Sequence, residues 1–321
     1  MRIGIVGLDS SHAREFARRI QTLHTDGKTA CRVSHCWDQA LSAPDQSVPT
    51  PATLHDLCIE SASSLDELLG SVEGVMVLST DGHRHLVPVI SSLERGLPTF
   101  VDKPLSCSAS DAWAMLKASR SARCFSASAL RFADRLSESD SIRIGKLRMI
   151  EATGPFQEHS SSPGLWYYGC HTFELVDSLW HEGGGPLQVR ARLLDTGHRI
   201  ELEYADGRLA VIGLDRTGVS PWQARVLGTT GEAAFVADLK PAYDRLVRGL
   251  CRFFAGEPPA VGLERSVSVI EAIEASQRSL SLGGEWVCLP APYQALTLGS
   301  IPENAAGATQ ECSGRHQKNL F

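Results

Sequence analysis

The sequence predicts an α/β fold in which a doubly wound parallel sheet is followed by an α+β domain with a mostly antiparallel, open sheet. Over residues 1–128, short apolar runs alternate with helical segments, which is typical of parallel strands joined by right-handed crossovers. Over residues 188–235, short alternating runs are separated by turns, which is typical of antiparallel strands. We therefore expect a first domain at residues 1–128, a second at 129–290 and a weakly structured polar tail at 291–321.

The first predicted strand, residues 2–7, runs into a turn that is a candidate phosphate-binding site. A dinucleotide-binding turn reads G-x-G-x-x-G, and here Gly7 matches its first glycine while Asp9 and His12 replace the other two. A carboxylate at Asp9 would repel a pyrophosphate unless it turned away. A serine can cap the helix that follows, and a helix N-terminus beside a strand end binds phosphate readily. The candidate cofactor-binding residues in this turn are Gly7, Asp9, Ser10, Ser11 and His12.

The second predicted strand, residues 32–38, ends in Asp38. At this place an acidic side chain can accept hydrogen bonds from the ribose of an adenosine. A 2′-phosphate would meet a like charge there, so Asp38 favours NAD over NADP. An ordinary turn aspartate is the alternative interpretation, because aspartate often begins turns.

Residues 99–106 hold the stretch around which the chain is organised. The apolar run at 99–101 indicates a buried strand, and Pro104 ends it. Lys103 then stands at the carboxyl end of a strand, the edge at which ligands bind in open α/β sheets. A lysine there can donate a proton or place a fixed positive charge beside a substrate oxygen. A solvated lysine at the start of a loop is the alternative.

Together these features resemble the Gfo/Idh/MocA family of NAD(P)-dependent oxidoreductases over roughly residues 1–290. Asp102-Lys103-Pro104 stands where that family has Glu-Lys-Pro, and His171 lies on a downstream helix. The resemblance implies a Rossmann fold for the first domain and NAD as the cofactor, with NADP less favoured. It places Asp102 and Lys103 at the nicotinamide and gives Lys103 a catalytic role.

The loop after the predicted strand at 74–79 follows another pattern of this family, Thr-Pro-x-x-x-His. Thr80 and His85 match the pattern, whereas Asp81 replaces its proline. In the family this loop lies beside the nicotinamide ribose. The resemblance therefore adds Ser79, Thr80 and His85 to the candidate cofactor-binding residues.

A helix that begins at Gly169 carries the candidate catalytic residues of the second domain. The family has an Asp-x-x-x-His-x-x-Asp pattern here, in which His171 matches the histidine and Tyr167 stands at the first aspartate. Histidine suits general acid–base catalysis because its pKa lies near neutral pH. The resemblance thus makes His171 catalytic, and the Tyr167 phenol is a substitute donor if its pKa falls well below about 10. A histidine with only a structural role is the alternative.

Four residues are candidates for binding the substrate. Arg131 matches an Arg-Phe pair at the start of the family's second domain, where an arginine can approach the cleft; a surface arginine is the alternative. Trp166 and Tyr168 can stack on a sugar face or on a flat ring. Glu174 matches the second acid of the helical pattern and shares a helix face with His171.

The composition excludes several classes of function. Lysine and arginine total 31 and aspartate and glutamate 37, so the net charge is −6, whereas nucleic-acid-binding proteins normally present a basic face. No apolar run is long enough to span a membrane, and no signal peptide is expected. The nine cysteines include no CxxC pair, so we predict no metal site and a cytoplasmic location. An open antiparallel sheet predicts a homodimer or a higher homo-oligomer.

These observations predict an NAD(P)-dependent oxidoreductase that transfers hydride between nicotinamide and a hydroxyl or carbonyl carbon of a small polar, sugar-like substrate. Lys103 and His171 would share the proton that leaves as the hydride does, while the cofactor carries the redox chemistry. One alternative is the same fold with internally recycled NAD, giving net epimerisation, elimination or hydrolysis. Another is an NAD-binding sensor or scaffold without catalysis. The altered glycine turn and the replacement of the family's aspartate by Tyr167 favour these two alternatives.

Overall fold

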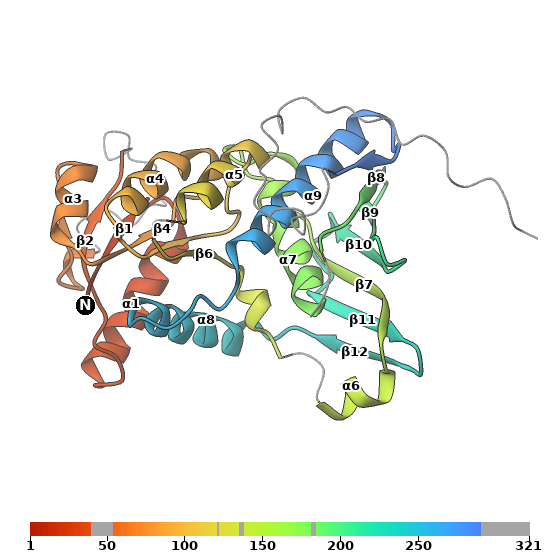
Figure 1. Cartoon of the computed structure of the whole chain (residues 1–321), viewed down its shortest axis with the longest axis horizontal. Helices are drawn as coiled ribbons and strands as arrows, with labels where there is room; N and C mark the ends of the chain where they lie inside the picture. The colour runs from red at the N-terminus through yellow and green to blue at the C-terminus, as the bar shows by residue number, and fades with distance from the viewer. Residues whose placement is uncertain (40–53, 121, 135–137, 181–183, 290–321) are drawn as a thin grey trace, which may run out of the picture.

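The computed structural model describes residues 1–289 except 40–53, 121, 135–137 and 181–183, and it contains two sheets side by side (Figure 1). The predicted tail at 291–321 lies outside the described residues. Within the described part, no helix is both long and apolar enough to cross a membrane. Seven cysteines there are free thiols. Cys288 is disulfide-bonded, whereas the scattered cysteines had indicated no disulfide framework.

The first sheet is the parallel, doubly wound sheet that the sequence predicts. Its six strands are all parallel and follow the order β3-β2-β1-β4-β5-β6. Chain order reverses at β1, so the crevice for a ligand opens at the carboxyl ends of β1 and β4. The strands are β1 (Arg2–Val6), β2 (Arg32–Trp37), β3 (Glu60–Ser61), β4 (Gly74–Val77), β5 (Thr99–Val101) and β6 (Cys124–Ser126).

Helices cover both faces of this sheet, which explains why its central strands are short and wholly apolar. The helices are α1 (Ser11–Thr25), α3 (Leu65–Ser71), α4 (Leu86–Glu94), α5 (Ala109–Ala118) and α8 (Leu239–Phe254). In Figure 1, α3, α4 and α5 lie on one side of the sheet, and α1 and α8 lie on the other. The fully or nearly fully buried Phe16, Phe100 and Phe253 belong to one core cluster. A helix from late in the chain therefore completes the core of the first sheet.

The second sheet has seven strands in the order β12-β11-β7-β10-β9-β8-β13. Only β7 and β10 pair in parallel, and the other neighbours are antiparallel, as the sequence predicts. The strands are β7 (Leu147–Pro155), β8 (Gln188–Leu194), β9 (Gly197–Glu203), β10 (Leu209–Asp215), β11 (Gln223–Gly228), β12 (Glu232–Val236) and β13 (Val287–Cys288).

Two helices cover one face of the second sheet, α7 (Gly169–Leu179) and α9 (Leu263–Ser281). Helix α9 also packs on α5 and β6, so it joins the two sheets. Residues on the strands alternate between buried positions and partly exposed ones. The partly exposed positions carry ion pairs, with Arg190 2.5 Å from Glu201 and Arg225 3.2 Å from Glu151. The uncovered face therefore carries ion pairs beside partly exposed apolar residues such as Val211.

The remaining helical segments are short connections. They are α6 (Glu138–Ile144) and the 3-10 helices η1 (Gly82–Arg84), η2 (Ala129–Phe132) and η3 (Gly164–Trp166). Segment η1 follows β4, and η2 follows β6 at the crossover into the second domain. Both lie next to the residues that the sequence singles out for function.

Candidate active site

The turn after β1 has the backbone that a phosphate-binding turn requires at its first glycine. Gly7 has a φ of +88°, and a Cβ there would come within 2.4 Å of the backbone nitrogen of Ser79. Only glycine permits both the positive φ and this close approach. The Ser10 side chain accepts a hydrogen bond from the backbone N–H of His12 at 3.0 Å and so caps α1. Ser11 is exposed at the first turn of α1.

Asp9, at the second glycine position, is turned into the protein. Its Oδ1 accepts a hydrogen bond from the backbone N–H of Thr80 at 3.1 Å, and the Thr80 hydroxyl donates to the Asp9 carbonyl at 3.1 Å. Burial raises the pKa of Asp9, although the Thr80 N–H and Arg84 oppose this. The carboxylate is thus directed toward Thr80 and Arg84.

Arg84 connects the ends of two further strands. Its guanidinium lies 2.6 Å from Oδ1 of Asp38 and 3.5 Å from Oδ2 of Asp9. The other oxygen of Asp38 accepts a hydrogen bond from the backbone N–H of Leu8 at 2.6 Å. Asp38 therefore lies beside the turn after β1, and it is already paired with an arginine that the sequence analysis did not single out. Its predicted contact with an adenosine ribose stays a prediction.

His12, at the third glycine position, joins the turn to the strand that precedes Lys103. Its Nδ1 lies 2.6 Å from Oδ2 of Asp102, and its Nε2 lies 2.8 Å from the hydroxyl of Tyr243 on α8. Burial alone would raise the pKa of Asp102, but the charge and hydrogen bond of His12, together with Lys103, lower it overall. Asp102 is thus held as a buried carboxylate between two basic side chains.

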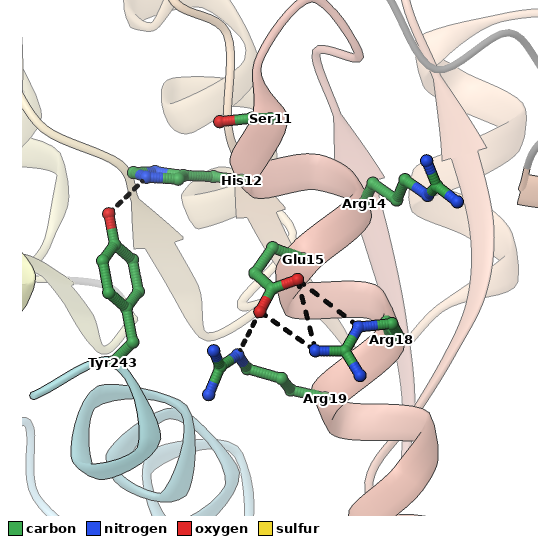
Figure 2. A pocket seen from close by; sticks show the side chains of 7 residues that line it. All are labelled: Ser11, His12, Arg14, Glu15, Arg18, Arg19 and Tyr243. Carbon is green, nitrogen blue, oxygen red and sulfur yellow. Dashed lines mark hydrogen bonds and ion pairs between the residues drawn. The ribbon is translucent and has the colours of Figure 1, made fainter. Parts of the chain in front are cut away.

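A pocket of about 510 Å³ opens between α1 and α8 (Figure 2). His12 and Tyr243 lie at one side of it, and their hydrogen bond is drawn there. The rest of its lining is Ser11, Arg14, Glu15, Arg18 and Arg19, with Glu15 bonded to both Arg18 and Arg19. Neither Lys103 nor His171 lines this pocket. It reaches the phosphate-binding turn from the side of α8.

Lys103, Tyr167 and His171 come together from the two halves of the chain. The Lys103 ammonium lies 5.0 Å from the centre of the Tyr167 ring, which is within the range of a cation–π interaction. Nδ1 of His171 lies 2.7 Å from the hydroxyl of Ser128, at the start of the crossover. Lys103 and His171 are 8% and 9% exposed, so water has little access to either.

His171 is electrostatically tuned to be neutral. Burial lowers its pKa well below the ordinary value for histidine, and the positive charges of Lys103 and His12 lower it further. A neutral imidazole can accept a proton at neutral pH. Of the three predicted catalytic residues, Lys103 and Tyr167 are thus in contact, and the charge of Lys103 acts on His171.

His85 is placed differently from a residue that would touch the cofactor. It is fully buried, and its ring nitrogens lie 2.8 Å from the carbonyl of Ser79 and 3.1 Å from the carbonyl of Leu105. The imidazole thus holds together the loops that follow β4 and β5. Its contacts support a positioning role for these loops.

Arg131 and Glu174 are buried against each other rather than open to a cleft. Nε of Arg131 lies 2.5 Å from Oε2 of Glu174, which also accepts a hydrogen bond from the Ser128 N–H at 2.8 Å. A second nitrogen of Arg131 lies 2.5 Å from Asp177. These pairs fasten α7 to η2 and so fix the Ser128–His171 contact. The geometry supports an anchoring role and does not support the predicted substrate role.

The aromatic residues before α7 divide into two groups. Trp166 is a buried core residue, whereas Tyr168 is partly exposed and its ring centre lies 6.0 Å from that of His171. Trp222 completes this wall, with its ring centre 5.4 Å from that of His171. Its indole nitrogen is buried without a hydrogen-bond partner among the described residues. The sequence analysis did not identify Trp222, because nothing in its local pattern indicates that it lies beside His171.

Three possible metal ligands also gather after β4. The ligand atoms of Asp81, His83 and Cys107 lie within 4.8 Å of one another. Asp81 accepts a hydrogen bond from the His83 N–H at 3.0 Å and so caps η1. Burial raises the pKa of the Cys107 thiol to about 11, and this thiol donates to the Ser162 hydroxyl at 3.9 Å. These contacts account for the local arrangement, and the sequence-based expectation of no metal stays a prediction.

The parallel sheet, the Gly7 turn and the buried lysine after β5 define a dinucleotide-binding oxidoreductase. Residues 1–128 match the Gfo/Idh/MocA family model, described as an oxidoreductase family with an NAD-binding Rossmann fold. This match confirms the resemblance and the enzyme class predicted from the sequence. No curated protein matches the chain.

Solved structures with the same fold cover about nine-tenths of the chain. Myo-inositol dehydrogenase from Lactobacillus casei, in complex with NAD(H) and myo-inositol, has a TM-score of 0.73 at 16% identity, covering 91% of this chain and 97% of its own. Myo-inositol 2-dehydrogenase from Lactobacillus plantarum has a TM-score of 0.72 at 15% identity, covering 90% and 99%. The UDP-N-acetylglucosamine 3-dehydrogenase GnnA from Acidithiobacillus ferrooxidans has a TM-score of 0.71 at 14% identity, covering 88% and 98%.

Proposed function

We propose that this chain is an NAD-dependent dehydrogenase that oxidises a hydroxyl-bearing carbon of a small polyhydroxylated substrate, or reduces the matching carbonyl. The observation that carries the proposal is the contact of Lys103, at the carboxyl edge of the parallel sheet, with the ring of Tyr167, four residues before His171 on the chain. The similar structures are named for their action on inositol or an aminosugar nucleotide, which supports a polyol as the substrate class.

The turn after β1 fits a dinucleotide. Gly7 supplies the tight turn, the capped N-terminus of α1 faces the same edge, and the Asp9 carboxylate is directed to Thr80 and Arg84. Bound NAD would supply the hydride acceptor there. Residues of this turn, together with Asp38, would hold the adenosine and phosphate parts. Thr80 would lie beside the nicotinamide ribose, and Lys103 would lie next to the nicotinamide.

In the proposed reaction, the charge of Lys103 stabilises an alkoxide-like oxygen as the substrate C–H bond is broken. Neutral His171 accepts the proton of the hydroxyl group, and in the reverse direction the protonated imidazole returns it. Ser128 orients the imidazole through Nδ1, and in the proposed tautomer Nδ1–H donates to the Ser128 hydroxyl, which leaves Nε2 to accept the proton. Low exposure keeps water from competing for that proton.

The direct test is a screen of cyclic polyols, aldoses and sugar nucleotides for the formation of NADH at its absorbance band. Turnover with at least one polyol, lost in the Lys103→Ala variant, supports the proposal. Product formed without net NADH would favour a recycled coenzyme. Binding of NAD with no turnover of any substrate class would favour the non-catalytic alternative. We also propose that the chain forms a homo-oligomer and binds neither nucleic acid nor a membrane.

A further inference from the structure

We propose that Arg84 is a coenzyme-binding residue whose guanidinium compensates the two carboxylates that this chain carries at its phosphate-binding turn. Arg84 would thereby allow a turn without the second and third glycines to accept a negatively charged dinucleotide. The inference rests on the proposed binding of NAD and adds a residue that the family pattern does not assign.

The turn after β1 carries an excess of negative charge. Asp9 follows β1 and Asp38 follows β2, and a dinucleotide brings two more negative charges from its phosphates to the same strand ends. The two carboxylates repel each other, and this repulsion contributes to the raised pKa of Asp9. Arg84 contacts both, so the three side chains together carry a charge of −1 instead of −2.

Arg84 lies across the end of β1 from Asp38. Arg84 follows β4, and β1 lies between β2 and β4 in the sheet. To reach Asp38, the Arg84 side chain must cross the carboxyl end of β1, where the pyrophosphate of a bound dinucleotide lies in sheets of this type. The guanidinium therefore supplies positive charge at the place where phosphate charge would arrive.

The turn lacks the second glycine of the dinucleotide-binding pattern, because Asp9 stands there. In a G-x-G-x-x-G turn the second glycine lets the backbone approach the pyrophosphate closely. Here Asp9 holds the Thr80 N–H at 3.1 Å instead, so some of that backbone contact must be replaced. An arginine can bind phosphate through two parallel N–H groups. The longer contact, 3.5 Å to Asp9, is the one that would open toward phosphate while the 2.6 Å contact to Asp38 stays.

The test compares four forms of the full chain by titration with NAD and with ADP-ribose, which has the diphosphate but no nicotinamide. They are the wild type, Arg84→Ala, Asp9→Asn, and the two changes combined. Asn at position 9 keeps an oxygen for the Thr80 N–H but removes the charge, so the double variant returns the turn to −1. Arg95→Ala is the matched control, because Arg95 is paired with exposed Asp66 after the neighbouring helix α4.

We expect Arg84→Ala to lower the affinities for NAD and for ADP-ribose by the same factor, roughly 10- to 100-fold, because a charged hydrogen bond is lost. The double variant should recover the part of this loss that comes from the uncompensated Asp9 charge, and Arg95→Ala should bind both ligands as the wild type does. If the double variant recovers none of the affinity, Arg84 does not compensate the carboxylates, and the inference is overturned. It is also overturned if Arg84→Ala binds both ligands like the wild type. If the wild type binds neither ligand, the proposed function fails as well. Thermal unfolding of the ligand-free variants separates a loss of fold from a loss of binding.

Discussion

Nδ1 of His12 lies 2.6 Å from the carboxylate of Asp102, and this contact joins the first helix of the chain to the residue that precedes Lys103. The histidine stands where a glycine turn would have no side chain at all. Its other nitrogen meets Tyr243, which comes from a helix more than two hundred residues later. One imidazole thus connects three segments around the candidate active site.

We expect His12→Ala to destabilise the protein more than Tyr243→Phe does. The first change leaves the buried Asp102 carboxylate without its partner, a cost of about 1–3 kcal/mol, whereas the second removes one hydrogen bond worth about 1 kcal/mol and keeps the carboxylate paired. Urea unfolding measures both, and the exposed His24→Ala variant is the control. Equal stability of His12→Ala and the wild type would contradict this view of the contact.

Lys103→Ala and His171→Ala should each lower turnover about 10²–10⁴-fold while NAD affinity changes little, because each removes a group that acts on the reacting oxygen. If the two share one proton path, the double variant should be little worse than the poorer single variant. Steady-state kinetics with the substrate found in the screen gives the three values. The exposed Lys117→Ala variant is the control. Losses that multiply would mean that the two groups act separately.

The lowered pKa of His171 predicts that the folded protein loses stability as the pH falls below about 6.5. In that range the unfolded chain binds a proton at this histidine while the folded state keeps it neutral, so acid favours unfolding. Above pH 6.5 the residue contributes no pH dependence. His171→Gln should therefore flatten the acid side of the stability curve, whereas exposed His24→Gln should not. Urea midpoints between pH 5 and 8 measure the difference.

NAD should bind about tenfold or more tightly than NADP. A 2′-phosphate would add negative charge beside Asp38, and Arg84 is already committed to that carboxylate at 2.6 Å. Asp38→Asn should narrow the gap between the two coenzymes. Titration calorimetry checks both statements, and equal or tighter binding of NADP by the wild type would remove Asp38 from this role.

The uncovered face of the second sheet should hold copies of the chain together. Partly exposed apolar side chains such as Val211 lie on this face beside ion pairs such as Arg190 with Glu201, so a second copy of the chain would remove apolar surface from water. Light scattering at micromolar concentration measures the mass against 34.7 kDa for one chain. A monomer mass would reject the prediction.

The sequence by itself determined the order and type of the main elements. Short apolar strands must be buried on both faces, so the pattern of residues 1–128 indicated a parallel sheet, and the two-residue alternation after residue 188 indicated an antiparallel one. It also determined that Gly7, Asp38 and Lys103 stand at strand ends, because the residue that follows an apolar strand lies at the edge of the sheet. The local caps, such as Ser10 on α1, could be read in the same way.

Only the tertiary structure decided which of these side chains meet. Arg84 pairs with Asp9 and Asp38, which lie 75 and 46 residues before it. His12 pairs with Asp102, 90 residues later, and with Tyr243, 231 residues later. Sequence periodicity places a residue on a face or at an edge, but it carries no information on contacts between distant segments. The burial of Arg131 and Glu174 was likewise visible only in the tertiary structure. Two opposite charges that are excluded from water pair with each other, which gives these residues a structural role in place of the predicted contact with substrate.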